Sequence, residues 1–190
     1  MRSPFAVLLI LVCASPVRGE AQATLRPGDG VAVTVGLSRG AGALTCPFCT
    51  GKGERGLAGM LGIDAPFRSR LRRALEANWW WHSSDGASRT VLALMPAIQL
   101  YPAGDAGFIL KAGLGIGRYA ASSDEEELRT TALTSMVGLG YRIPLAGRNV
   151  VVPYASWLTG SGGAMRLNGA LVTPFGGMTL LQYGLAWTRR

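Results

Sequence analysis

The feature of this chain that most restricts its fold is the alternation of side chains near its carboxyl-terminal end. From Leu180 to Thr188, apolar residues alternate with small or polar ones. The apolar positions are Leu181, Tyr183, Leu185 and Trp187. Because successive side chains of a strand point to opposite faces, this pattern predicts a strand with one apolar face. The same alternation recurs along the chain, most clearly over 107–119, and it predicts an all-β fold.

The first residues have the pattern of a secretory leader. Arg2 supplies a positive charge, residues 5–12 form an uninterrupted apolar run, and residues 21–23 offer a small-x-small cleavage site. We therefore expect residues 1–23 to be removed as a signal peptide, leaving one domain over 24–190, or 190 − 23 = 167 residues. That length accommodates about eight membrane-crossing strands of about ten residues, together with their turns.

The composition favours strands that face lipid over helices that span it. Hydrophobic residues make up 48% of the chain, yet no apolar run after the leader approaches the roughly 18 residues of a membrane helix. Alternating lipid-facing and lumen-facing positions produce high hydropathy without long runs. The net charge is +8, but the positive residues are dispersed, so nucleic acid is not an expected partner. A soluble β-sandwich or lipocalin-like barrel, with its apolar faces inward, is the structural alternative.

Eight segments are predicted strands, separated by Gly, Pro and polar turn residues. They are 30–38, 56–65, 70–81, 89–101, 107–119, 130–143, 150–158 and 180–188. Long connections follow the first, third, fifth and seventh segments, and short ones follow the others. That rhythm is typical of extracellular loops and periplasmic turns, so we predict a single closed antiparallel up-and-down transmembrane β-barrel. Pro96 interrupts the fourth segment and removes a ladder hydrogen bond, which predicts a bulge there.

Polar residues on one face of the predicted strands indicate a filled, charged lumen. The predicted lumen cluster consists of Arg70, Arg72, Glu76, Asn78, Lys111 and Arg142, with Asp64 as a further acid. Structural salt bridges are the main interpretation of this cluster, and an anion-binding or proton-related role is the alternative. On the other face, aromatic residues are expected at the membrane interfaces. They are Trp79, Trp81, Tyr183 and Trp187.

The leader, the eight alternating strands, the loop rhythm and the aromatic last strand together resemble the small outer-membrane barrels of the OmpA, OmpX and OmpW type. The resemblance is architectural and covers 24–190. It implies a bacterial outer-membrane location, outer-membrane lipid as the surroundings, and a monomer. It also implies that the barrel-assembly machinery reads the last strand, where Tyr183, Leu185 and Trp187 suit that recognition. The chain ends Thr188-Arg189-Arg190, however, and not on the aromatic residue usual in these barrels.

The same resemblance implies a structural, adhesive or surface-interaction role without catalysis. OmpW-like proteins imply one alternative, which is the binding or lateral passage of a small apolar molecule through the barrel wall. A second alternative is enzymatic, because His82 and Ser84 have the H-x-S spacing of PagL-type lipid A deacylases. Glu76 is then the candidate to orient the imidazole, as a serine hydrolase requires.

Two further motifs have simpler interpretations. Cys46 and Cys49 lie close together in an exported chain, which favours a disulfide that stiffens the first loop. A thioredoxin-like redox site would need a strand leading into a helix, and a metal site would need further ligands, whereas His82 is the only histidine. We expect no cofactor and no metal. The acidic run over 124–127 is interpreted as a solvated loop tip.

Overall fold

The structure is a computed structural model that describes residues 30–47, 49, 53–84, 86–103 and 107–189. The predicted leader, 1–23, lies outside the described residues. The elements are β1 (Ala32–Thr45), β2 (Glu54–Arg68), β3 (Leu71–Ser84), β4 (Ala87–Leu100), β5 (Gly107–Ser122), β6 (Glu127–Pro144), β7 (Asn149–Leu167) and β8 (Ala170–Arg189). No helix in the described part of the chain is long and apolar enough to span a bilayer.

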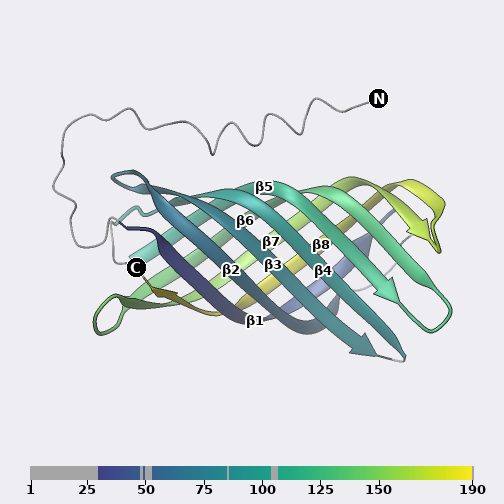
Figure 1. Cartoon of the computed structure of the whole chain (residues 1–190), viewed down its shortest axis with the longest axis horizontal. Helices are drawn as coiled ribbons and strands as arrows, with labels where there is room; N and C mark the ends of the chain where they lie inside the picture. Colours follow the sequence, from purple (N-terminus) through teal and green to yellow (C-terminus); the bar gives the residue numbers. More distant parts are fainter. Residues whose placement is uncertain (1–29, 48, 50–52, 85, 104–106, 190) are drawn as a thin grey trace.

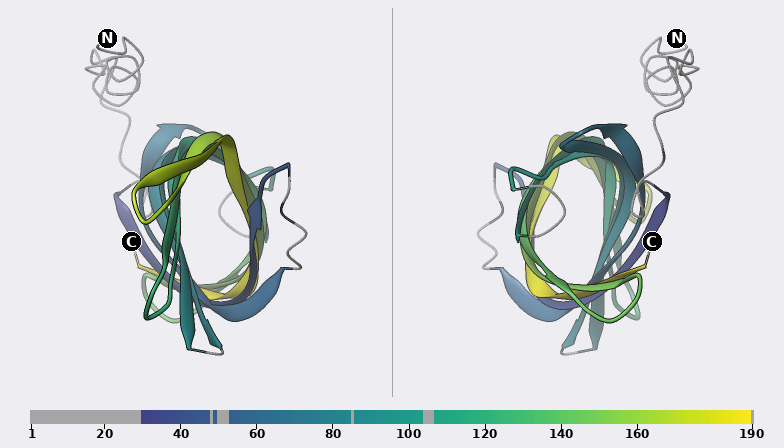
Figure 2. Two further views of the ribbon diagram at one scale, coloured as in Figure 1. Left: turned by 90° about the vertical axis from the view of Figure 1, so that its right-hand side faces the viewer. Right: turned by 90° about the vertical axis from the view of Figure 1, so that its left-hand side faces the viewer.

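The eight strands form one closed barrel in sequence order, which confirms the predicted fold class (Figure 1). Each strand pairs antiparallel with its neighbours, and β1 pairs with β8 from Val33↔Arg189 to Thr45↔Gly177 to close the ring. Figure 2 shows this ring from both ends. Closure removes the exposed edges that an open sheet would leave. The start of β1 and the end of β8 lie at the same end of the barrel, here called the termini end. The opposite end, at which β1, β3, β5 and β7 finish, is called the hairpin end.

Apolar side chains of the barrel wall point outward. Leu110, Leu114, Leu181 and Leu185 are all 45–60% exposed, although each belongs to a regular, paired strand. The soluble alternative required these residues to be sequestered inside. In an up-and-down barrel with this orientation, the outer face has the apolar band that transmembrane barrels present to lipid.

The strands extend further than their local pattern predicts, and the expected rhythm of long and short connections was wrong. The Gly-rich stretch 159–177 belongs almost entirely to β7 and β8, which stay paired up to Leu167↔Ala170. The connections after β3 and β7 are only 85–86 and 168–169. Cross-strand pairing overrides the weak strand propensity of glycine here, and three register shifts absorb the irregularity. Strands of 14–20 residues exceed the roughly 9–11 needed to cross a bilayer.

Pro96 does not produce the expected bulge. The register of β4 on β5 is the same on both sides of it, at Leu94↔Ile116 and Ala97↔Gly113. The pairing with β3 also passes through Pro96 without a shift, opposite Leu75. The missing donor is therefore accommodated by a local break in one ladder, without an inserted residue.

The interior of the barrel is divided into an apolar half and a polar half. The half toward the hairpin end contains Trp80, Met95, Met136, Leu158, Met178 and Leu180, each no more than 2% exposed. The polar half contains the charged residues described below. The sequence analysis expected a polar filling throughout, whereas bulky apolar side chains form the core of the half toward the hairpin end.

Trp80 can enter the lumen because glycines face it. A Cβ added at Gly42 would lie 2.8 Å from the indole ring, and one added at Gly40 would lie 3.0 Å from it. The indole Nε1 donates to the Gly40 carbonyl at 3.2 Å. The close approach of a rigid ring explains why these two positions carry glycine.

We predict that Gly42→Ala destabilises the folded barrel by about 1–3 kcal/mol, because a rigid, fully buried ring cannot move aside. Urea unfolding in lipid vesicles, followed by tryptophan fluorescence, measures the change. Gly53→Ala is the matched control, since its added Cβ would have no neighbour closer than 3.8 Å. Equal stability of the two variants would show that the Trp80 ring can move away from the added methyl group without a measurable loss of stability.

Candidate functional site

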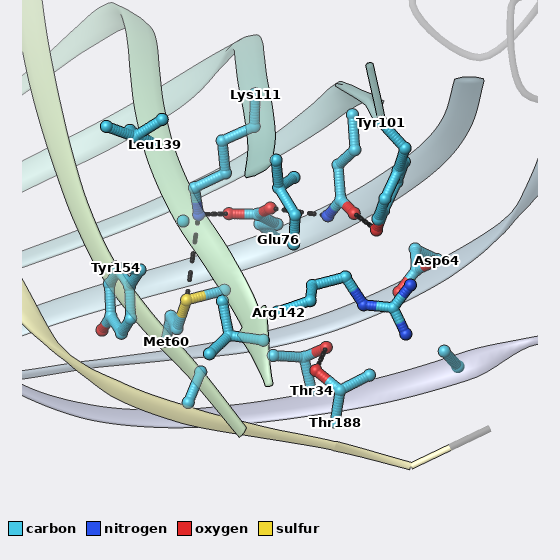
Figure 3. A pocket seen from close by; sticks show the side chains of 16 residues that line it. Thr34, Met60, Asp64, Glu76, Tyr101, Lys111, Leu139, Arg142, Tyr154 and Thr188 are labelled. Atoms are coloured by element: carbon cyan, nitrogen blue, oxygen red, sulfur yellow. Dashed lines mark hydrogen bonds and ion pairs between the residues drawn. The ribbon is translucent and has the colours of Figure 1, made fainter. Parts of the chain in front are cut away.

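The polar half of the lumen is organised around Glu76, which is fully buried on β3. Lys111 Nζ donates to one carboxylate oxygen at 2.7 Å, and Gln99 Nε2 donates to the other at 3.2 Å. Tyr101 OH in turn donates to Gln99 Oε1 at 2.6 Å. Figure 3 shows this chain of contacts crossing the barrel interior. A carboxylate with a cation on one oxygen and an amide on the other satisfies the conditions under which a buried charge is tolerated.

A second ion pair lies nearer the termini. Arg72 Nε donates to Asp64 Oδ2, and Arg72 Nη2 donates to the Gly30 carbonyl at 2.7 Å. Arg142, 4% exposed, places its guanidinium 5.5 Å from the centre of the Tyr101 ring and extends toward Asp64 in Figure 3. Arg72, Lys111 and Arg142 stand against Asp64 and Glu76, so the buried cluster carries one surplus positive charge, and the Tyr101 ring lies beside the Arg142 guanidinium.

A neutral network separates this cluster from the apolar half. Gln182 Nε2 donates to Asn78 Oδ1 at 2.5 Å and to Ser156 Oγ at 2.9 Å. The three residues come from β8, β3 and β7, and all are buried. They therefore join opposite walls of the barrel through side chains alone.

The polar half encloses a small cavity. Its volume is about 40 Å³, and its lining includes Asp64, Glu76, Lys111, Arg142 and Tyr154. A cavity needs about 10–15 Å³ to hold one water, so this cavity has room for a few waters and no larger solute. The buried apolar cluster of the other half lies beyond this cavity.

The structure places most of the predicted lumen cluster in this half, with one correction. Arg72, Glu76, Asn78, Lys111 and Arg142 are buried inside the barrel. Arg70 was predicted to join them, but it lies exposed in the β2–β3 turn, because β3 begins one residue later than expected. Four members of the network were missed: Gln99, Tyr101, Ser156 and Gln182. Their inward positions follow from the alternation, but uncharged polar residues gave no separate signal.

The predicted interfacial aromatics all point away from the lumen. Trp81, Tyr183 and Trp187 are exposed on the outer face. Trp79 is half-buried, because its indole ring lies over Gly59, where an added Cβ would be 2.6 Å from the ring. Trp81 lies toward the hairpin end and Trp187 toward the termini end, so the aromatics mark both ends of the apolar band.

The two remaining motifs lie at the hairpin end. Cys46 and Cys49 form a disulfide with a Cα–Cα distance of 4.9 Å, immediately after β1. His82 Nε2 lies 3.2 Å from Ser84 Oγ and 3.6 Å from Glu54 Oε2, and Glu54 also pairs with Arg89. The proposed orienting role of Glu76 was wrong, since Glu76 is bound to Lys111 deep in the lumen.

This His82 arrangement differs from a catalytic triad in one respect. A triad needs the serine on one ring nitrogen and the acid on the other. Here both groups contact the same nitrogen, and Arg89 holds the acid. His82, Ser84, Glu54 and Arg89 therefore form a polar cluster at the rim of the barrel.

Comparison with known proteins identifies the fold alone. No family model matches the chain, and no curated protein matches it. Among solved structures, Neisserial surface protein A (NspA) superimposes with a TM-score of 0.62 at 8% identity, covering 84% of this chain and 96% of that one. Ail, the attachment invasion locus protein of Yersinia pestis, gives 0.58 at 14% identity, covering 84% and 99%. The chain thus has the architecture of the small eight-stranded outer-membrane barrels.

Proposed function

We propose that this chain is an integral protein of the bacterial outer membrane with a structural or surface-interaction role and no catalytic turnover. The observation that carries the proposal is the combination of an outward apolar face with a closed interior. Leu114 and Leu185, both 60% exposed, need an apolar environment around the barrel. The filled lumen makes the molecule a rigid anchor without a passage for solutes.

The hairpin end supports a surface role. The β7–β8 hairpin continues past the last β1–β8 pair, Thr45↔Gly177, and arches at this end of the barrel in Figure 1. It carries Leu171, Val172 and Phe175, which are 56–68% exposed. Apolar side chains at the tip of a hairpin beyond the membrane are typical of a contact surface. One neighbour in fold, Ail, is named for attachment and invasion, and the same kind of role is proposed for this hairpin.

The proposed partners follow from the same picture. Outer-membrane lipid surrounds the apolar band, and the barrel-assembly machinery reads β8 during insertion. Tyr183, Leu185 and Trp187 face outward on β8, where such a reader could contact them. The chain is proposed to act as a monomer.

The alternative of lateral passage for an apolar molecule has less support. Passage needs a gap in the wall, but β1 stays paired with both of its neighbours. Its Gly36 pairs with Met60 on β2 and with Ala186 on β8. The hydrolase alternative has a direct test. Lipid A deacylation that depends on His82 and is lost in His82→Ala would favour it over a role without turnover.

Membrane fractionation of cells expressing the chain tests the main proposal. The chain is expected in the outer-membrane fraction, and its gel migration is expected to change on heating, because closed barrels resist detergent until they are boiled. Recovery as a water-soluble particle without detergent would contradict the proposal. A second variant, with the β7–β8 hairpin shortened by removing 164–173, should keep this behaviour and lose attachment of expressing cells to host-cell surfaces.

A further inference from the structure

An apolar groove runs along the outer face of the barrel where β1 meets β2 and β8. Its volume is about 540 Å³. The walls are Val35, Leu37, Leu61, Trp79, Leu185 and Trp187, and the floor includes Gly36 and Ala186. Trp79 forms one wall by lying flat over Gly59, which pairs with Leu37. The shape of the groove is therefore set by the Trp79 ring packed on Gly59 and by the line along which β1 pairs with β8.

Two arginines lie directly beyond one end of this groove. Arg39 follows Val35 and Leu37 on the outward face of β1, on the side toward the hairpins. Arg55 on β2 pairs with Ala41, so the two arginines are diagonal neighbours on adjacent strands. Both are exposed. Tyr183 pairs with Arg39 from the β8 side, which adds an interfacial aromatic at the same level.

Among the described residues, no acid offsets the charge of these arginines. Within the described part of the chain, no carboxylate forms an ion pair with Arg39 or Arg55. Glu54 is adjacent in sequence but is bound to Arg89. On the opposite wall, by contrast, the outward Arg129 pairs with Glu127. Two like charges beside an apolar groove fit an anionic group on an apolar molecule.

We propose that this surface is a binding site for an acylated membrane lipid whose headgroup carries a phosphate monoester. One acyl chain lies in the groove, and Arg39 and Arg55 bind the phosphate. A phosphate monoester carries about −1.5 to −2 charges at neutral pH, which matches two guanidinium groups better than the single charge of a phosphodiester. The proposal rests on the proposed membrane location of the barrel.

Fluorescence quenching tests the site, because Trp79 and Trp187 line the groove. The barrel is purified from outer membranes of cells expressing the full chain and placed in phosphatidylcholine nanodiscs. Phosphatidic acid or phosphatidylglycerol with brominated acyl chains is then added at equal mole fractions. Phosphatidic acid, the monoester, is expected to quench at about tenfold lower mole fraction than the diester, as one additional charge-assisted hydrogen bond allows.

Matched variants separate the site from general surface charge. Arg39→Gln/Arg55→Gln should abolish the preference for the monoester, and Arg118→Gln/Arg129→Gln, on the outer face of β5 and β6, should keep it. Val35→Phe, which fills the groove, should weaken quenching by both lipids. The site is refuted if the unaltered barrel shows no preference, or if the control pair loses it equally. Failure to enter nanodiscs at all would instead contradict the membrane location.

Discussion

Lys111→Met is expected to destabilise the folded barrel by about 3–5 kcal/mol, the largest effect of any single substitution considered. The reason is that Glu76 is fully buried and that Lys111, at 2.7 Å, is its one ionic partner among the described residues. Removing the cation leaves an uncompensated charge in a space with room for only a few waters. Urea titration in phosphatidylcholine vesicles, read by heat-modifiable gel migration, measures the loss.

A double variant distinguishes this explanation from lost packing. Glu76→Gln/Lys111→Met removes both charges while an amide still accepts from Gln99, so most of the stability should return. Arg129→Met is the surface control, because its pair with Glu127 is exposed and worth at most about 1 kcal/mol. A double variant as unstable as Lys111→Met would show that the lysine acts through its aliphatic chain and not its charge.

Leu114→Arg is expected to cost about 2–4 kcal/mol, the value for an arginine on the lipid face near the bilayer midplane. Leu114 is 60% exposed in the middle of β5, where only an apolar environment makes that exposure favourable. The same vesicle titration measures the change.

Leu171→Arg is the matched control for this second prediction. Leu171 is equally exposed, at 57%, but it lies at the tip of the β7–β8 hairpin, where the expected cost is about 0–1 kcal/mol. Equal costs at the two positions would mean that Leu114 does not face lipid. A Leu114→Arg variant as stable as the unaltered barrel would contradict the membrane location itself.

The lumen pairings illustrate what local sequence pattern could and could not predict. Alternation placed Glu76 and Lys111 on inward faces, because a strand repeats every two residues regardless of its neighbours. It did not show that Lys111 pairs with Glu76 or that Arg72 pairs with Asp64. Those choices depend on the register between neighbouring strands and on the strand tilt that closure of the ring imposes.

The sequence by itself determined the direction of most strand side chains, and hence the all-β class, the outward leucines and most of the inward charges. Only the tertiary structure decided how far each hairpin extends, which groups meet inside the ring, and that Arg39 and Arg55 border a groove. The physical reason is that side-chain direction is a property of one extended segment, whereas length, register and neighbourhood are properties of pairing between segments. Arg70 was misplaced for that reason, since a shift of one residue at a strand end separates the lumen from a turn.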